Sequence, residues 1–542
     1  MIKARKYVFL IVLTVLALLA PTGALADPVR SCADLVTAGL HPPADALSLT
    51  IDSAAVIAGT ATLPEHCFVQ GHLDTEINFE MRLPTAWNRK VLMLGNSAYA
   101  GSIPSWDDGV ARQYAVVGTD TGHSGWGAEA LLNRPDRIAN FQYRAVHLVA
   151  LTAKRIAGTY YHSAPRHTYF IGCSRGGLQA MLEVQKYPDD FDGVIAGAPH
   201  LPNGGFQLWD MRALFPGGPD TGVLPWQKVA LLSQIVLTKC DGLDGVIDGI
   251  VDDPRACNLS PRDDLPGCAN NVDGPDCFTR AQVTALDKIH QGSESHGKQL
   301  GPKFFFSGVE GYSLFDLRPY DIDVDILDFS NNESGFPGAP FSWLYPDLFG
   351  PGMPSFLYWT QINFLRYIAF GDPNYLLQNF DFNRSSDVKT YFSALAPQLP
   401  SSPDLSAFAR KGGKLIEWHG WGDSVASPMG TVEFYEAGAK VMGGLDRTRS
   451  FDRLFMVPGQ AHCGDGPGPC SFDTLPVLEQ WVEAGKAPNF LIGTNPNSGL
   501  SRPICAYPKV ARLKNSSLDP NVASSFACVD VEDHRQEDED SR

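Results

Sequence analysis

The chain has 542 residues, more than one hydrophobic core usually organises, so two domains or one domain with a large insertion are expected. Hydrophobic residues make up 44% and charged residues 19% of the chain, a composition typical of a globular enzyme and not of a disordered or fibrous protein. The formal net charge is -17, and no cluster of Lys and Arg follows the first few residues, so the chain repels a phosphate backbone. Nucleic acid is therefore excluded as an expected partner.

The N-terminal segment has the pattern of a secretory signal peptide. Basic residues precede an apolar run over residues 7–20, and small residues at 24–26 resemble a cleavage site. The alternative is an uncleaved membrane anchor, but the run is short for a membrane span. We predict a signal peptide over residues 1–26, a secreted or periplasmic protein, and no membrane span after cleavage.

Export affects how the eleven cysteines are interpreted. An oxidising compartment makes disulfides the default, and the absence of a C-x-x-C motif argues against a zinc ribbon or a thioredoxin-like site. The odd number leaves one cysteine unpaired. Counting alone does not give the connectivity.

Strands and helices are expected to alternate in the first part of the chain. The apolar patterns predict strands at 77–83, 91–94 and 114–118, a helix at 141–157, a strand at 168–172, a helix at 178–186 and a strand at 193–198. Strands and helices in this order imply a parallel sheet.

The pattern changes between about residues 200 and 400, where Pro, Gly, Trp and Phe are frequent, cysteines cluster and the alternation stops. We predict an inserted lid domain over residues 201–399. The alternation returns with a strand at 414–418, a helix at 430–441, a strand at 453–457 and a helix at 472–484. The α/β domain is thus expected in two parts, residues 27–200 and 400–529, followed by a disordered acidic tail over 530–542.

A G-x-S-x-G sequence lies between a predicted strand and a predicted helix. It reads GCSRG at residues 172–176 and follows the apolar residues 169–171. This is the context of a nucleophile elbow, the tight turn that presents the catalytic serine in the α/β-hydrolase fold. We therefore predict that Ser174 is a nucleophile; the alternative is a structural turn, because so short a pattern also occurs by chance.

Asp423 and His462 complete a candidate triad. A serine hydroxyl needs a histidine to accept its proton and an acid to orient that histidine, and in α/β-hydrolases the chain order is Ser, acid, His. Asp423 follows the predicted strand at 414–418, and His462 follows the one at 453–457. Taken singly, Asp423 also fits a turn aspartate and His462 a structural loop histidine.

Two backbone N–H groups are candidates for the oxyanion hole. The first belongs to Arg175, next to the nucleophile, and the second to Ser97 in the loop at 95–101, which follows an early strand. The alternative for this loop is a polar segment without a catalytic part.

Two cysteines adjoin the triad candidates: Cys173 precedes Ser174, and Cys463 follows His462. A bond between them would tie the nucleophile to the base. Closing so long a loop contributes about 4 to 5 kcal/mol in the chain-entropy model. The alternative is two buried free thiols.

This arrangement resembles the tannase and feruloyl esterase family, whose pattern is Cys-Ser, then Asp, then His-Cys, with the two cysteines bonded. The pairs Cys173-Ser174 and His462-Cys463, together with Asp423, match it residue by residue, and the resemblance covers nearly all of the mature chain. It implies an α/β-hydrolase fold with a large inserted lid domain and the Cys173–Cys463 disulfide. The other disulfides that it implies are Cys32–Cys67, Cys240–Cys257, Cys268–Cys277 and Cys505–Cys528, which leaves Cys470 without a known partner.

The resemblance also implies a structural calcium site in the lid, at residues 240–250. Calcium prefers several hard oxygen ligands. The implied ligands are the carboxylates of Asp241, Asp244 and Asp248 and the backbone carbonyls of Val246 and Ile250. The alternative is an acidic, solvated turn.

Aromatic residues in the lid suit a flat phenolic acyl group, although most of them also fit a lid core; they include Trp343, Tyr345, Tyr358, Trp359, Phe364 and Phe370. Arg366 and Phe370 lie four residues apart on an expected helix, so both are candidates for substrate binding. In the terephthalate monoester hydrolases of the family a lid arginine binds the free carboxylate. For Arg366 a structural ion pair is the alternative.

These residues predict a secreted serine carboxylic ester hydrolase that acts on small aromatic acid esters through an acyl-enzyme. A feruloyl esterase is the first expectation, and a tannase acting on galloyl esters or a mono(2-hydroxyethyl) terephthalate hydrolase are the alternatives. An inert binding protein of the same fold would be expected to lack part of the triad. A secreted peptidase would need an amine-recognition feature, which the sequence does not reveal.

Overall fold

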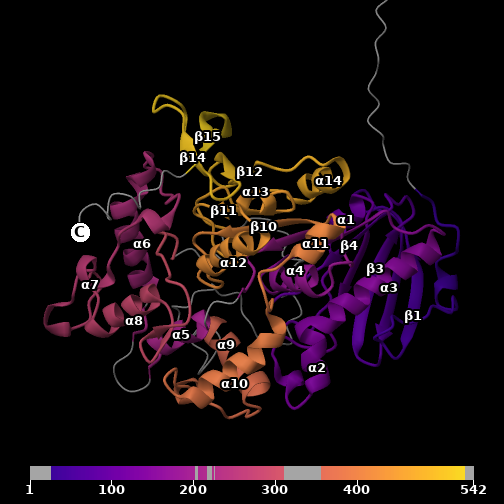
Figure 1. Ribbon diagram of the computed structural model, residues 1–542, viewed down its shortest axis with the longest axis horizontal. Coiled ribbons are helices and arrows are strands. Elements are labelled where there is room, and N and C mark those ends of the chain that lie inside the picture. Colours follow the sequence, from indigo (N-terminus) through magenta and orange to yellow (C-terminus); the bar gives the residue numbers. More distant parts are fainter. Residues whose placement is uncertain (1–25, 202–204, 217–221, 225, 311–355, 531–542) are drawn as a thin grey trace, which may run out of the picture.

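A nine-stranded sheet forms the centre of the protein, seen here in a computed structural model that describes residues 26–201, 205–216, 222–224, 226–310 and 356–530 (Figure 1). Nearly all of the predicted signal peptide (1–26) and acidic tail (530–542) lies outside these residues. In sheet order the strands are β1 (Leu49–Ile57), β2 (His66–Leu73), β3 (Ile77–Pro84), β5 (Ala115–Thr119), β4 (Lys90–Leu94), β6 (His167–Cys173), β7 (Gly193–Gly197), β10 (Lys414–Gly420) and β11 (Asp452–Val457).

The sheet is antiparallel at one end and parallel over the rest. β1, β2, β3 and β5 pair antiparallel in turn, whereas every pair from β5 to β11 is parallel. β1, β2 and β3 are joined by short loops, which permit antiparallel pairing but leave no room for the crossover that parallel pairing needs. The parallel sheet predicted from the alternation of strands and helices is thus found from β5 onward.

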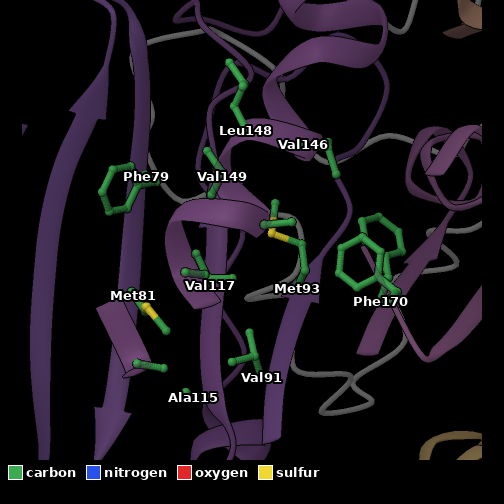
Figure 2. Close-up of a cluster of buried hydrophobic side chains, with 14 of the residues drawn as sticks. Phe79, Met81, Val91, Met93, Ala115, Val117, Val146, Leu148, Val149 and Phe170 are labelled. Atoms are coloured by element: carbon green, nitrogen blue, oxygen red, sulfur yellow. The ribbon is translucent and has the colours of Figure 1, made fainter. Parts of the chain in front are cut away.

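Helices cover both faces of the parallel part. Along β4, Val91 and Met93 are buried in one hydrophobic core, and Leu92 and Leu94 in another, because successive side chains of a strand point to opposite faces. Figure 2 shows the first core, where these side chains meet those of α3 (Ala145–Tyr160). α4 (Arg175–Lys186) packs on this same face, and α14 (Leu475–Ala484) on the other. Each large side chain buried in this way stabilises the fold by about 1.5 to 3 kcal/mol.

The chain leaves the sheet after β7 and re-enters it at β10, which pairs directly with β7 in parallel register. We call residues 201–399 the lid and the α/β remainder the body. The main helices described in the lid are α5 (Phe206–Leu214), α6 (Trp226–Cys240), α8 (Arg280–Gln291), α9 (Phe356–Asn363) and α10 (Ser385–Leu395). They lie together to one side of the sheet and bury a core of their own, which includes Leu232, Leu286 and Leu365 (Figure 1).

Two small hairpins that the sequence did not predict follow α14. β12 (Phe490–Thr494) pairs with β13 (Ser501–Cys505), and β14 (Val510–Leu513) with β15 (Phe526–Val529). Within the described ranges, no helix has the length and apolar character needed to cross a bilayer. Cys470 is a free thiol. The other cysteines form the five disulfides that the family resemblance implies: Cys32–Cys67, Cys173–Cys463, Cys240–Cys257, Cys268–Cys277 and Cys505–Cys528.

Candidate active site

The three triad candidates lie at one edge of the sheet. Ser174 follows β6, Asp423 follows β10 and His462 follows β11. All three strands belong to the parallel part, so their carboxyl ends lie on the same side. The fold therefore gathers residues that are far apart in the sequence.

Ser174 has a backbone conformation that is rare for a residue with a side chain. Its φ is 61° and its ψ is -120°, a strained combination of the kind found at nucleophile elbows. The turn is held by a 3.0 Å hydrogen bond from the Ser174 N–H to the Gly197 carbonyl. A Cβ on Gly172 would lie 2.5 Å from the carbonyl carbon of Gly176, so the turn requires glycine at position 172.

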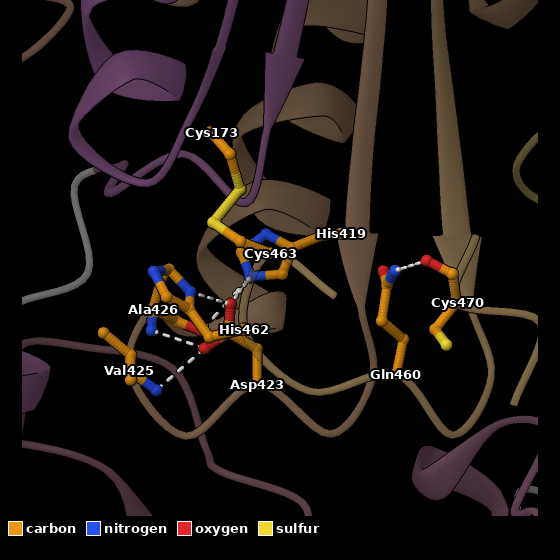
Figure 3. Close-up of a disulfide and its surroundings, with 9 residues drawn as sticks. All are labelled: Cys173, His419, Asp423, Val425, Ala426, Gln460, His462, Cys463 and Cys470. Atoms are coloured by element: carbon orange, nitrogen blue, oxygen red, sulfur yellow. Dashed lines mark hydrogen bonds and ion pairs between the residues drawn. A yellow bond between two sulfur atoms is a disulfide. The ribbon is translucent and has the colours of Figure 1, made fainter. Parts of the chain in front are cut away.

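Asp423 is fully buried and bonded on both carboxylate oxygens (Figure 3). Oδ1 accepts the N–H groups of Val425 and Ala426, each at 2.8 Å, and Oδ2 lies 2.6 Å from Nδ1 of His462. Burial acts to raise the pKa of Asp423, but the contacts with His462 and His419 outweigh it and lower the pKa. The aspartate thus stays ionised and holds the imidazole of His462 in one orientation.

Two further histidines at strand ends were given no role in the sequence analysis. His419, at the end of β10, lies 3.1 Å through Nε2 from Asp423 Oδ2 and 2.7 Å through Nδ1 from Thr431 Oγ1. His200 follows β7, and its ring centroid is 5.9 Å from that of His462. Burial, followed by the charge of His462, lowers the pKa of His200 to about 3, so this ring is neutral at neutral pH. Position at the carboxyl end of a parallel strand is the signal that could have identified both.

The Cys173–Cys463 disulfide joins the residues next to Ser174 and His462 (Figure 3). Its Cα atoms are 5.9 Å apart, although the two cysteines are 290 residues apart in the sequence. Among the described residues no hydrogen bond links Ser174 to His462, so this covalent bond is the direct link between their two loops. Catalytic hydrogen bonds often tighten only when substrate is bound.

The loop after β4, which contains the predicted oxyanion donor Ser97, lies beside the cavity. Ala98, with a φ of 40°, lines the same cavity as Ser174, whereas Ser97 is not among the lining residues. Arg175 is the first residue of α4, so its N–H has no acceptor within the helix. Arg175 and Ala98 both line the cavity beside Ser174, and the oxyanion hole stays a prediction.

A cavity with about 780 Å³ of empty space, including its open mouth, lies beside Ser174. The body and the lid both contribute to its lining: Ala98, Tyr99, Phe141, Ser174, Arg175, Leu178, His200, Leu201, Gln207, Phe356, Thr360, Gln361, Phe364, Tyr391, Leu395, Gln398 and Leu399. Aromatic rings and aliphatic chains therefore form part of the wall beside the serine, as a flat acyl group requires, and polar side chains such as Gln361 and Gln398 form the rest.

Of the lid aromatics singled out from the sequence, Phe364 lines this cavity. Arg366 and Phe370 are not among the lining residues: Arg366 donates through Nε to the Tyr375 carbonyl at 2.9 Å, and Phe370 stacks on the Tyr375 ring at 4.3 Å. Trp343 and Tyr345 lie outside the described residues.

A chain of side-chain hydrogen bonds connects the lid to the loop of Asp423. The Tyr391 hydroxyl donates to Gln361 Oε1 at 3.2 Å, and Gln361 Nε2 donates to Gln207 Oε1 at 2.6 Å. Gln207 Nε2 donates at 2.6 Å to the carbonyl of Val425, whose own N–H binds Asp423. No local pattern reveals this chain, because its members come from distant segments.

The predicted calcium loop follows α6 and is closed by the Cys240–Cys257 bond. Asp241 accepts backbone N–H groups from Asp248, Gly249 and Ile250, so its carboxylate holds the loop in shape. Asp244 accepts the N–H of Val246 at 2.9 Å.

Asp252, which the sequence analysis did not select, belongs to the same acidic cluster. It is buried, its Oδ1 has no hydrogen-bond partner among the described residues, and burial together with the charge of Asp244 raises its pKa to about 8. Arg502 donates to Asp248 at 2.5 Å, and Arg512 to Asp252 at 3.1 Å. With Asp241 and Asp244 counted, the cluster holds four carboxyl groups and two guanidinium groups, and the raised pKa of Asp252 reflects this excess of acidic groups. A divalent cation with hard oxygen ligands fits this excess.

Known proteins share this arrangement over most of the chain. The family described as "Tannase and feruloyl esterase" matches residues 62–312 and 366–529. A mono(2-hydroxyethyl) terephthalate hydrolase of Piscinibacter sakaiensis is 31% identical over 545 residues, which cover 88% of this chain and 87% of that protein. A probable feruloyl esterase of Arthroderma benhamiae is 32% identical over 479 residues, with coverage of 82% and 81%.

Solved structures share the fold. Feruloyl esterase B from Aspergillus oryzae has a TM-score of 0.72 at 25% identity and covers 92% of this chain and 99% of its own. The tannin acyl hydrolase from Aspergillus niger has a TM-score of 0.69 at 21% identity, with coverage of 93% and 96%. The family match spans more than half of the chain and includes Ser174, Asp423 and His462. The chain therefore belongs to the tannase and feruloyl esterase family and is a carboxylic ester hydrolase with an α/β-hydrolase fold.

Proposed function

We propose that this enzyme hydrolyses esters of aromatic acids, with feruloyl-type esters as the preferred class. The observation that carries the proposal is the cavity beside Ser174, whose walls include the rings of Tyr99, Phe141 and Phe364. Flat aromatic acyl groups bury large apolar surfaces against such rings. Two relatives, named as a probable feruloyl esterase and a mono(2-hydroxyethyl) terephthalate hydrolase, support the same substrate class.

In the proposed mechanism Ser174 Oγ attacks the ester carbonyl carbon while His462 Nε2 takes the hydroxyl proton. The N–H groups of Arg175 and of Ala98, or of Ser97 beside it, stabilise the oxyanion. The tetrahedral intermediate then collapses: the ester C–O bond breaks, and His462 returns the proton to the departing alcohol. Water, deprotonated by His462, attacks the carbonyl carbon of the acyl-enzyme; the bond to Ser174 Oγ then breaks, His462 returns the proton to Oγ, and the aromatic acid leaves. Asp423 stabilises the imidazolium through Nδ1 in both halves of the reaction.

Replacement of the nucleophile tests the mechanism. Ser174→Ala should lower the hydrolysis of methyl ferulate by several orders of magnitude with little change in the unfolding temperature, because only the hydroxyl is lost. Unchanged turnover would show that Ser174 is not the nucleophile. Comparison of methyl ferulate, methyl gallate and mono(2-hydroxyethyl) terephthalate on the wild-type enzyme tests the substrate class. Equal and feeble rates on all three would overturn it.

We also propose a structural calcium ion in the acidic loop of the lid. Asp244, Asp248 and Asp252 would hold it together with the carbonyls of Val246 and Ile250, while Asp241 shapes the loop. The excess of carboxyl groups over guanidinium groups, and the Asp252 oxygen that accepts no hydrogen bond among the described residues, support this proposal. A chelator should lower the unfolding temperature of the wild type but not that of Asp252→Asn. An unfolding temperature that is insensitive to the chelator in both proteins counts against the site.

We infer that the enzyme works in an oxidising compartment outside the cytoplasm, after its signal peptide has been removed. Five disulfides support this location, because such bonds persist where thiols are oxidised. N-terminal sequencing of the protein from culture fluid or periplasm should find a mature chain that starts near Asp27. Recovery of the enzyme only in the cytoplasm, with its first residues intact, would contradict this location.

A further inference from the structure

His200 is a neutral ring in the wall of the cavity beside Ser174, and the proposed mechanism gives it no role. The residue follows β7, is partly exposed, and meets His462 edge to face, with ring centroids 5.9 Å apart and planes at 75°. Burial, followed by the charge of His462, lowers the pKa of His200 to about 3. This histidine is thus too weak a base to accept the serine proton at neutral pH. It contributes the hydrogen-bonding groups of a neutral imidazole, which are one donor and one acceptor.

Gln207 determines which nitrogen of His200 carries the proton. Gln207 Nε2 lies 2.6 Å from the Val425 carbonyl and 3.4 Å from Nδ1 of His200. A carbonyl oxygen can only accept a hydrogen bond, so the atom that faces Val425 is the amide nitrogen, and the amide oxygen is left to accept from Gln361 Nε2 at 2.6 Å. The second N–H of the Gln207 amide then donates to Nδ1 of His200, which must be unprotonated. In a neutral ring the proton is therefore on Nε2.

The Nε2–H group of His200 is open to the cavity. Nε2 forms no hydrogen bond within the ranges that the structure describes, and it is not one of the enclosed polar atoms that lack a partner. The ring lines the cavity, and its Nδ1 is taken up by the lid amide, so Nε2–H is the donor that a ligand meets. A ligand that covers this donor without offering an acceptor removes it from water uncompensated, which weakens binding.

We propose that His200 is a specificity-determining residue, which donates a hydrogen bond from Nε2 to an acceptor oxygen on the alcohol part of the ester. The inference rests on the proposed aromatic-ester activity and concerns the other half of the substrate. In that mechanism His462 returns the proton to the departing alcohol, so the departing oxygen lies within hydrogen-bond distance of the His462 ring. Two rings 5.9 Å apart can each bind a different oxygen of one small alcohol at about 2.9 Å. An ether or hydroxyl oxygen two carbons from the departing oxygen is the acceptor that fits.

A matched pair of esters tests the proposal on the wild-type enzyme. 2-Methoxyethyl ferulate and butyl ferulate have the same length, but only the first has an acceptor oxygen within its alcohol part. We expect kcat/KM to favour the methoxyethyl ester by about threefold to tenfold, the effect of one hydrogen bond between neutral groups. Each value is divided by the rate constant for hydrolysis by hydroxide, which corrects for the difference between the two leaving groups.

The outcomes separate this inference from the proposed function. A corrected ratio of one, or hydrolysis of methyl ferulate but of neither longer ester, overturns the role of His200 while the aromatic-ester activity stands. Hydrolysis of none of the three esters overturns the proposed function itself.

Substitutions of His200 assign the preference to its Nε2–H group. His200→Phe removes the donor and should bring the ratio close to one. His200→Gln places an amide N–H near the position of Nε2 and should retain part of the preference, whereas the shorter His200→Asn reaches only the position of Nδ1 and should not. His41→Phe, at an exposed histidine that does not line the cavity, should leave the ratio unchanged. Persistence of the full ratio in His200→Phe overturns the proposal.

A second pair of esters keeps the test decisive if the His200 variants do not fold. 3-Methoxypropyl ferulate and pentyl ferulate place the ether oxygen one carbon further from the departing oxygen, so the preference of the wild-type enzyme should shrink. An equal preference for the ether in both pairs reflects the solvation of ethers in general and not a donor at a fixed position, and it overturns the proposal.

The acyl part of the ester supplies the remaining control. Methyl ferulate and methyl cinnamate differ only in their acyl groups, and the ratio of their kcat/KM values should be the same in the wild type and in His200→Phe. A change in this ratio places His200 against the acyl group and overturns its assignment to the alcohol part.

Discussion

The body and the lid meet at one cavity, but they hold their residues there by different means. In the body, Ser174, Asp423 and His462 follow neighbouring parallel strands, and a disulfide and backbone N–H groups fix them. In the lid, Gln361 and Tyr391 reach the cavity from helices and are held by side-chain hydrogen bonds. We conclude that the body sets the chemistry within narrow limits, whereas the lid can change with smaller effects.

The largest loss is expected at Asp423, which we propose orients His462 as the general base. Asp423→Asn keeps the size of the side chain but replaces an acceptor oxygen, so His462 loses its partner for the Nδ1–H. By analogy with the equivalent change in serine proteases, kcat should fall by about 10⁴. Steady-state kinetics with a phenolic ester measure the effect, and Asp404→Asn, on an exposed loop, is the matched control. A loss of less than tenfold in Asp423→Asn would show that Asp423 is not the orienting acid.

The second-largest loss of activity is expected from removal of the Cys173–Cys463 disulfide. Cys173→Ala with Cys463→Ala lowers the free energy of unfolding by about 5 kcal/mol in the chain-entropy model and also frees the base to move away from the nucleophile. Cys505→Ala with Cys528→Ala is the control, because its shorter loop is worth about 3 kcal/mol and lies away from the site. Urea unfolding and kcat are both measured. Equal kcat values in the two variants would mean that the Cys173–Cys463 bond only stabilises the fold.

A smaller effect is expected where the lid contacts the body. Gln207→Leu leaves the Val425 carbonyl and the Gln361 amide without their partner, at a cost of about 1 kcal/mol in the placement of the Asp423 loop. This corresponds to roughly a fivefold loss of kcat/KM. Gln234→Leu, at an exposed position of the lid, should have no effect. A loss as large as that of Asp423→Asn would remove the distinction between a rigid body and an adjustable lid.

The smallest effect on activity is expected from a change in the buried acid pair Glu417 and Asp452 of the body. Titration of this pair should instead affect stability. Burial raises the pKa of Glu417 from 4.5 to about 8, and burial together with Glu417 raises that of Asp452. Between about pH 4.5 and 8 the folded chain keeps a proton that the unfolded chain has released. The free energy of unfolding should therefore fall as the pH rises, with a slope of about 1.4 kcal/mol per pH unit for one proton. Glu417→Gln should flatten this slope in urea titrations at pH 5 and pH 8, and an unchanged slope would show that the pair does not titrate there.

The sequence predicted those features that depend on local pattern. The strands before Ser174, Asp423 and His462 are short and mainly apolar, and the elbow has its glycines at fixed spacing, so strand, turn and helix could be located within a few residues. The disulfide pairs followed from the family resemblance and not from spacing. β1 and β2 were not predicted individually, because their half-exposed sides interrupt the apolar runs.

Features that depend on long-range contact could not be predicted. The choice between Ser97 and Ala98 depends on how the loop after β4 meets α4, which no local signal records. Arg366 was selected from helical spacing, but the chain turns its Nε to the Tyr375 carbonyl. The position of the proton on His200 follows only once the hydrogen bonds of Gln207, which comes from the lid, are known.

The Cys173–Cys463 bond also constrains how the enzyme matures. Cys240 pairs with Cys257 and Cys268 with Cys277 over separations of 17 and 9 residues, so these bonds can form as soon as their own segments reach an oxidising compartment. Cys173 can form its bond only once Cys463, 290 residues further along the chain, is present. The four other cysteines lie between these two in the sequence and could pair wrongly with Cys173. If the loss of kcat predicted above is found, the enzyme gains activity only after oxidative folding has paired these two distant thiols. Correct pairing by a disulfide isomerase, and not only the rate of secretion, would then determine the yield of active enzyme.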